Sequence, residues 1–186
     1  MPGEKEFRNK GLTYCATCDG PLFVSKEVAV IGGGNSALDA TLQLMRIAKH
    51  IYIINITQAL GGDAIMREKV LASKVVTVFN NTQVTEVIGG KMVTAIKIKN
   101  ENKEEILSVQ GIFVEIGLIP NSEFARDIQK NRWQEIEVSH YNETNIPGIF
   151  AAGDVTDVPE KQIIIAAGEG SKAALSAFRY LAQQKF

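Results

Sequence analysis

The chain has 186 residues, 45% hydrophobic and 22% charged, which is typical of a protein that buries a core and excludes a disordered segment. Its 20 lysines and arginines against 21 aspartates and glutamates leave a formal charge of -1, without the basic surplus that nucleic-acid or anionic-lipid binding needs. No apolar run approaches the ~20 residues that cross a bilayer, and the polar start (MPGEKEFRNK) lacks the apolar core of a signal peptide. We therefore expect a soluble, cytoplasmic protein with no membrane and no nucleic-acid partner.

The first third of the chain predicts one strand–turn–helix–strand unit. Residues 1–13 are polar and are expected to form an arm or linker. A short apolar run, EVAVI at 27–31, suits a buried parallel strand and leads directly into a glycine-rich turn and an amphipathic helix. A second buried strand is expected at 51–54, which completes a βαβ unit.

Farther along, the spacing of apolar residues changes. Four short β-branched segments between 75 and 108, beginning with VVTVF, predict a small antiparallel meander, and GIFVEIG predicts another buried strand. The last third predicts a strand in IPGIFAAGDV and a long helix over about 162–183. We therefore expect an α/β protein, with a Rossmann-like dinucleotide-binding domain over 14–117 and a second segment over 118–186.

Two cysteines, Cys15 and Cys18, stand three residues apart in YCATCDG. A tetrahedral zinc site needs four ligands, and the two histidines, His50 and His140, stand singly and far away, so we expect no metal. A lone Cys-x-x-Cys is typical of a redox dithiol, with Asp19 as a candidate proton donor. The alternative is a pair of buried cysteines in a turn.

The glycine turn after the first strand reads Gly32, Gly33, Gly34, Asn35, Ser36 and Ala37. In a dinucleotide-binding turn, the first glycine permits the tight bend, the second lets the backbone approach a pyrophosphate, and the third small residue packs helix against strand. The helix start adds about half a positive charge. The alternative is a glycine-rich loop between core elements, but the flanking strands and helix favour a nucleotide site.

The end of the second strand carries the position that distinguishes NADH from NADPH. Asn55 stands there, near the position at which an acidic residue holds the adenosine ribose of NAD. An asparagine can still bind a 2′-hydroxyl, and no arginine or lysine follows before Met66 to bind a 2′-phosphate. The sequence thus favours NADH over NADPH.

Gly153 and Asp154 end the strand expected in the last third of the chain. A carboxylate beside a glycine at a strand end can bind a polyol such as a ribityl chain. The alternative is an ordinary turn.

Taken together, these motifs resemble those of the low-molecular-weight thioredoxin reductases and of the alkyl hydroperoxide reductase flavoproteins. The resemblance covers nearly the whole chain and rests on YCATCDGPLF, VAVIGGGNSALDA, GIFVEIGLIPN and PGIFAAGDVTDVPEKQIIIAAGEGSKAALSAFRYL. It implies that electrons pass from a nicotinamide through FAD to the disulfide, and then to a thioredoxin-like or peroxiredoxin-system protein. It also implies a homodimer.

The resemblance assigns roles to individual residues. Cys18 would face the flavin, Cys15 would attack the partner disulfide and Asp19 would be the acid. The remaining positions would bind the two cofactors: Gly32, Gly33, Gly34, Asn35, Ser36 and Asn55 the nicotinamide dinucleotide, Gly153 and Asp154 FAD, Gln162 and Ile163 the flavin-facing helix start, with Gly117 also in the cofactor-binding set.

In one respect the chain departs from that family. The family's N-terminal FAD-binding half has no counterpart in these 186 residues. We therefore expect the chain by itself to hold FAD poorly. A non-catalytic nucleotide-binding module and a truncated fragment stay open as alternatives.

Overall fold

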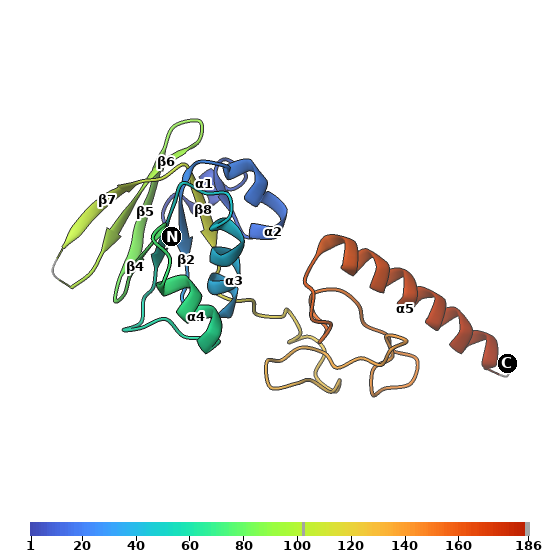
Figure 1. Cartoon of the computed structure of the whole chain (residues 1–186). Helices are drawn as coiled ribbons and strands as arrows, with labels where there is room; N and C mark the ends of the chain where they lie inside the picture. The colour runs from blue at the N-terminus through green and yellow to red at the C-terminus, as the bar shows by residue number, and fades with distance from the viewer. Residues whose placement is uncertain (102, 185–186) are drawn as a thin grey trace. The chain divides into compact units, whose positions relative to one another are not determined.

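A computed structural model describes residues 1–101 and 103–184, so the last two residues of the expected 118–186 segment lie outside the described part. The chain divides into two compact units, Met1–Gly117 and Leu118–Phe186 (Figure 1). Both sheets belong to the first unit, and the second unit carries the long helix near the C-terminus.

Five parallel strands form the central sheet of the first unit. Their order is β1-β8-β2-β3-β4. In register, Ile31 at the end of β2 lies beside Ile54 on one side and Val114 on the other, so the carboxyl ends of the three strands are level. The strands are β1 (Leu12–Thr13), β2 (Glu27–Ile31), β3 (His50–Ile54), β4 (Val76–Phe79) and β8 (Gly111–Val114).

Helices cover one face of this sheet and a second sheet covers the other. Along β2, Val28 and Val30 point into the core shared with the helices, whereas Ala29 and Ile31 point into the core shared with the second sheet. The helices are α2 (Ala16–Asp19), the 3-10 turn η1 (Gly20–Phe23), α3 (Asn35–Leu44) and α4 (Ala64–Leu71); the second sheet is antiparallel, β5 (Gln83–Gly89), β6 (Val93–Lys99) and β7 (Glu104–Ser108) (Figure 1). The predicted α/β class and the βαβ unit are confirmed.

Residues 1–13 are not the arm that their polarity predicts. They form α1 (Glu4–Phe7) and the edge strand β1, which pairs with β8. Phe7 and Leu12 are fully buried in the core between the two sheets. Two apolar side chains are enough to anchor a mostly polar segment, because each buries its whole surface.

The segment VVTVF also differs from its prediction. It forms β4, a parallel strand beside β3, and not the first strand of the meander. Val76 and Val78 pack on the helix side, where Ile51 and Ile53 of β3 also lie. A short β-branched run suits both kinds of sheet, so the neighbouring strand decided which one it joined.

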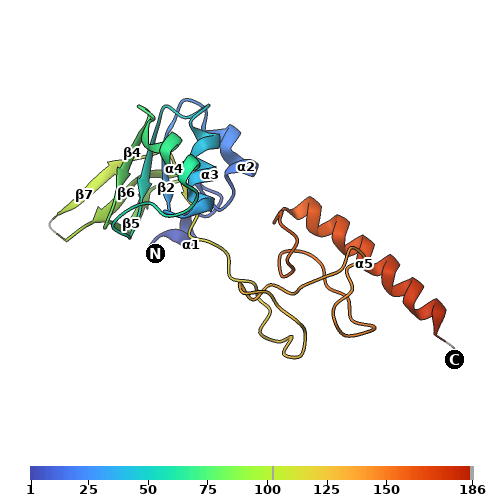
Figure 2. The same ribbon diagram turned by 60° about the horizontal axis from the view of Figure 1, so that its bottom comes forward.

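The second unit contains one helix, α5 (Ile163–Gln183), close to the predicted span. The strand expected in IPGIFAAGDV is not formed: Phe150 makes a single bridge to Glu143, and the described part of the unit otherwise contains turns and isolated bridges. Without a partner strand, the backbone groups of this segment are satisfied by turns instead. Figure 2 shows the straight helix α5 and the winding chain that precedes it. None of the described helices is long and apolar enough to span a membrane.

Candidate nucleotide and dithiol site

The glycine turn packs tightly on one side and is open on the other. Gly32 has φ +140°, and a Cβ on it would lie 2.1 Å from the carbonyl oxygen of Glu115. A Cβ on Gly33 would lie 2.2 Å from Asn55 Oδ1, whereas a Cβ on Gly34 would meet nothing within 4 Å. The first two glycines are thus needed for close packing inside the protein, and Gly34 faces open space where a ligand can approach.

Helix α3 begins directly after this turn. Gly34 is its N-cap, and the first backbone N–H groups of a helix have no acceptor within the helix, so those near Asn35 and Ser36 can bind an anion. Asn35 also positions a neighbouring loop, because its Oδ1 accepts a hydrogen bond of 2.7 Å from the Asp63 N–H. Gly61 N–H donates to the Gly33 carbonyl at 2.8 Å, so this loop folds against the turn.

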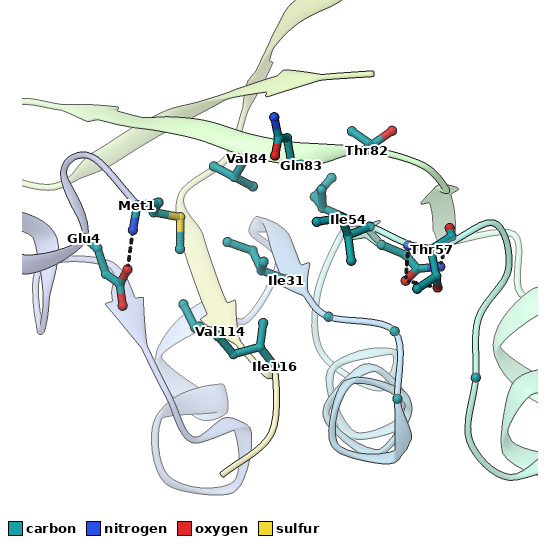
Figure 3. Close-up of a pocket in the computed structure, with 16 residues that line it drawn as sticks. Met1, Glu4, Ile31, Ile54, Thr57, Thr82, Gln83, Val84, Val114 and Ile116 are labelled. Carbon is teal, nitrogen blue, oxygen red and sulfur yellow. Dashed lines mark hydrogen bonds and ion pairs between the residues drawn. The ribbon is translucent and has the colours of Figure 1, made fainter. Parts of the chain in front are cut away.

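A pocket of about 560 Å³ opens beside the turn, at the carboxyl ends of the parallel strands. Figure 3 shows Val84 and Gln83 of β5 above it, and Ile31, Val114 and Ile116 on the opposite wall. Its other lining residues are Met1, Glu4, Gly32, Gly33, Gly34, Ile54, Asn55, Ile56, Thr57, Gly61 and Thr82. Apolar walls that end at a phosphate-binding turn suit a nucleotide.

Asn55 lies at the edge of this pocket but is only 2% exposed. Its Nδ2 donates to the Thr57 carbonyl at 3.1 Å and to Asn80 Oδ1 at 2.8 Å, and its Oδ1 accepts from the Thr57 hydroxyl at 2.9 Å. The side chain predicted to hold the ribose instead orders the loop after β3. The more exposed positions at this place are Ile56 and Thr57, which the sequence motifs did not assign to the site.

Cys15 and Cys18 form a disulfide, with 5.3 Å between their Cα atoms. Cys15 is the N-cap of α2, and the Cys18 N–H donates to Cys15 Sγ at 3.1 Å. Cys15 is half-buried and Cys18 is exposed. Two linked cysteines at the surface fit a redox dithiol better than a buried structural pair.

Asp19, the predicted acid, ends helix α2. Its carboxylate accepts a hydrogen bond from the Thr13 hydroxyl, and the same Thr13 oxygen accepts from the Cys15 N–H at 3.3 Å. Thr13, at the end of β1, thereby holds the carboxylate and the cysteine turn together. The sequence contained no pattern that marked Thr13.

Glu115, which directly follows β8, is a second carboxyl group near the dithiol, and no sequence motif marked it. It is half-buried, and burial raises its pKa to about 7; the nearby Asp39 charge acts in the same direction, while the Ala16 backbone N–H opposes it. A perturbed carboxyl group beside a cleft is typical of a functional site.

One known protein family matches most of the chain. A profile of the pyridine nucleotide-disulphide oxidoreductases matches residues 1–170. The chain belongs to the pyridine nucleotide-disulphide oxidoreductase family. Members of this family are oxidoreductases that use a pyridine nucleotide and FAD, and the resemblance inferred from the sequence motifs is confirmed.

Individual relatives of this oxidoreductase narrow the comparison. The alkyl hydroperoxide reductase of Escherichia coli, in its F subunit, is 45% identical over 189 residues, which cover 100% of this chain and 36% of the relative. An NADH dehydrogenase of Ferdinandcohnia aciditolerans is 44% identical over 184 residues, which cover 97% of this chain and again 36% of the relative. The chain thus spans about a third of the length of these relatives.

Solved structures point the same way. Thioredoxin reductase of Streptococcus pyogenes superposes with a TM-score of 0.92 at 29% identity, covering 99% of this chain and 61% of that one. Thioredoxin reductase of Giardia duodenalis gives 0.89 at 33% identity, covering 98% and 61%. Both agree with the predicted fold.

The second unit contains the other positions that the family resemblance assigned to FAD. Gly153 has φ +80°, and its carbonyl accepts from the Thr156 N–H at 3.0 Å and the Thr156 hydroxyl at 2.7 Å, which closes a tight turn. Asp154 is exposed on this turn, and Gln162 is the N-cap of α5, where Ile163 is 91% exposed. A turn with an accessible carboxylate and a helix start with an open first turn fit a polar, extended ligand.

Two predicted features lie outside these arrangements. Gly117, with φ +93°, follows Ile116 at the end of the first unit and does not line the pocket. Among residues 1–101 and 103–184, no three His, Cys, Asp or Glu side chains lie close enough together to hold a metal ion.

Proposed function

We propose that this chain is the nicotinamide-dinucleotide and dithiol part of a flavin-dependent disulfide reductase. The observation that carries the proposal is the position of the Cys15–Cys18 disulfide in the same compact unit as the dinucleotide turn. Helix α2 is tied directly to α3, because the Thr17 hydroxyl donates to Gln43 Oε1 at 3.0 Å. The helix that presents its start to the phosphates thus also supports the dithiol.

The proposal divides the chemistry between three groups of residues. Gly34, Asn35 and Ser36 would bind the pyrophosphate through backbone N–H groups, and the apolar pocket walls would hold the rest of the dinucleotide. The turn at Gly153 and Asp154 and the start of α5 at Gln162 and Ile163 would hold FAD. When bound, FAD supplies the electron relay between a hydride donor and a disulfide. Asp19 would protonate the leaving sulfur, in the role assigned to it by the family resemblance.

We further propose NADH as the nucleotide. Asn55, Ile56 and Thr57 carry no cation for a 2′-phosphate, and Arg67 lies beyond them, with Nη1 3.5 Å from the Leu60 carbonyl. A 2′-phosphate without a cationic partner forfeits hydrogen bonds worth about 1.5–3 kcal/mol each, so NADH should bind at least tenfold more tightly than NADPH. Calorimetric titration with both nucleotides tests this, and tighter NADPH binding would show it wrong.

The proposed electron acceptor is the disulfide of a thioredoxin-like or peroxiredoxin-system protein. The names of the relatives support this choice, and the exposed sulfur of Cys18 can be reached from outside. Replacing Cys18 by serine should trap a mixed disulfide between Cys15 and a thioredoxin whose own resolving cysteine has been replaced. Trapping on Cys18 in the Cys15→Ser variant instead would reverse the two sulfur roles.

The activity itself is tested by NADH-driven reduction of a protein disulfide in the presence of FAD. Cys15→Ser and Cys18→Ser should each abolish it, whereas Thr17→Ser, which lies between the cysteines and keeps its hydroxyl, should not. Unchanged turnover in either cysteine variant would refute the role of the pair. NADH binding without any disulfide exchange would favour the non-catalytic nucleotide-binding module.

A further inference from the structure

Glu115 lies between the two motifs of the site. Strand β8 is hydrogen-bonded to β1 on one side and to β2 on the other, and its Phe113 pairs with Thr13 and with Val30. Strand β1 leads into Cys15 and β2 leads into Gly32. The residue that follows β8 is therefore flanked by the start of the dithiol turn and by the dinucleotide turn.

The backbone of Glu115 contacts the dinucleotide side. Its N–H donates to the Ile31 carbonyl at 2.8 Å, and its own carbonyl oxygen occupies the place where a Cβ on Gly32 would stand. Its side chain contacts the other side, because the carboxylate accepts a hydrogen bond from the Ala16 N–H. Ala16 is buried and follows Cys15 directly, so the carboxyl group lies close to the disulfide.

The ionisable groups around this carboxyl group come from two helices. Asp39 of α3 faces it and repels its charge, and Gln43 Nε2 holds Asp39 Oδ2 at 2.7 Å. Helix α2 and its cap add Asp19 and the cysteine pair. The adjoining strand ends, Leu12–Thr13 and Ile31, add no ionisable side chain. A half-buried carboxyl group surrounded by other acids is the group to which a proton can be added when more negative charge forms nearby.

We propose that Glu115 is a positioning residue that takes up a proton when the Cys15–Cys18 disulfide is reduced, acting through the start of helix α2. This inference rests on the proposed function, whose dithiol it concerns. In reduction by a small-molecule dithiol, the reductant gives two electrons and two protons and becomes a disulfide, and the Cys15–Cys18 S–S bond breaks. One proton stays on one cysteine sulfur, the other goes to the Glu115 carboxylate, and the second sulfur remains a thiolate.

The sign of the pH dependence follows from charge repulsion. Below pH 6 Glu115 is neutral whether the pair is oxidised or reduced, because its pKa of about 7 lies above that pH, so the carboxyl group does not affect the reduction equilibrium. Above pH 7.5 the carboxylate is charged in the oxidised protein and disfavours the thiolate of the reduced one. Glu115→Gln keeps an oxygen to accept from the Ala16 N–H but removes that charge.

The test is an equilibrium redox titration of the full 186-residue chain in dithiothreitol buffers from pH 5.5 to 8.5, with the reduced fraction measured by alkylation and mass spectrometry. Glu115→Gln should match the wild type at pH 5.5 and be reduced about tenfold more readily at pH 8, which corresponds to about 30 mV. Glu86→Gln, on the exposed face of β5, is the matched control and should follow the wild type throughout.

An offset of equal size at every pH would indicate a structural effect, and no offset at all would show Glu115 to be uninvolved; each overturns the proposal. Asp39→Asn is a second variant: removing its charge should lower the pKa of Glu115 and extend proton uptake to lower pH. Because the titration uses neither nucleotide nor protein partner, a pH-dependent difference in a chain inactive with NADH would refute the proposed function but leave this inference standing.

Discussion

Asn55 lies directly against Gly33, since a Cβ on that glycine would come within 2.2 Å of Asn55 Oδ1. The side chain at the end of β3 therefore supports the dinucleotide turn of β2 from below. Its amide is engaged with Thr57 and Asn80, which orders the loop that borders the pocket.

Asn55→Asp tests this arrangement. The new carboxylate oxygen would face the Thr57 carbonyl and Asn80 Oδ1, two acceptors, in place of the amide that donates to both. We expect the free energy of unfolding to fall by about 1–3 kcal/mol, measured by urea denaturation. Asn81→Asp, on the adjoining exposed turn, should cost much less. Unchanged stability with tighter NADH binding would show instead that residue 55 contacts the ribose, as the sequence predicts.

Gly32→Ala and Gly34→Ala should separate folding from binding. Gly32 combines φ +140° with a backbone oxygen in the way, so its alanine variant should lose about 3 kcal/mol or more of stability. Gly34 has an ordinary φ and open space around it, so Gly34→Ala should change thermal stability little. Its methyl group would stand where phosphates approach, and the Kd for NADH should rise about tenfold. If Gly34→Ala bound NADH normally, this turn would not hold the pyrophosphate.

Ile56→Arg should change the nucleotide preference. Ile56 is 72% exposed and lines the pocket just beyond β3, so an arginine there could reach a 2′-phosphate without displacing core residues. We expect NADPH affinity to rise about tenfold, the value of one charge-assisted hydrogen bond, with NADH affinity nearly unchanged. Ile106→Arg, on the exposed face of β7, is the control for added charge. An equal gain in both variants would mean that the effect is non-specific attraction.

Glu135 should make the stability of the second unit depend on pH. Burial acts to raise the pKa of this carboxyl group, but hydrogen bonds from Lys161, at 2.9 Å, and Asn131, at 2.7 Å, outweigh it and hold the pKa below its usual value. A lowered folded-state pKa contributes stability above the unfolded pKa, near 4.5, and that stability is lost as the pH falls through the folded value.

We therefore expect Glu135→Gln to destabilise this unit by about 1.5–3 kcal/mol at pH 7 and to match the wild type in acid. The single tryptophan, Trp133, lies in the second unit and reports its unfolding by fluorescence. Glu123→Gln, at an exposed position, is the control. A difference that persisted below pH 3 would show that the Lys161 pair is not its source.

Local sequence was sufficient for the features that lie on consecutive residues. The glycine turn could be recognised because EVAVI, three glycines and an amphipathic helix follow one another, and the dithiol because two cysteines share one turn. The long helix at Ile163–Gln183 was predictable for the same reason. In each case the hydrogen bonds or side chains concerned are within a few residues of one another, so the pattern of residue types determines the structure.

Tertiary structure alone decided the features that depend on distant partners. VVTVF joined β3 and not the meander, Leu12 and Phe7 became core, and β5 came to roof the pocket, because each placement depends on which surface was available to bury. The same holds for side chains: Asn55 turned its amide to Asn80, and Glu115 met the Ala16 N–H almost a hundred residues earlier in the chain. A residue type states which bonds it can make, but only the folded chain decides which partner is within reach.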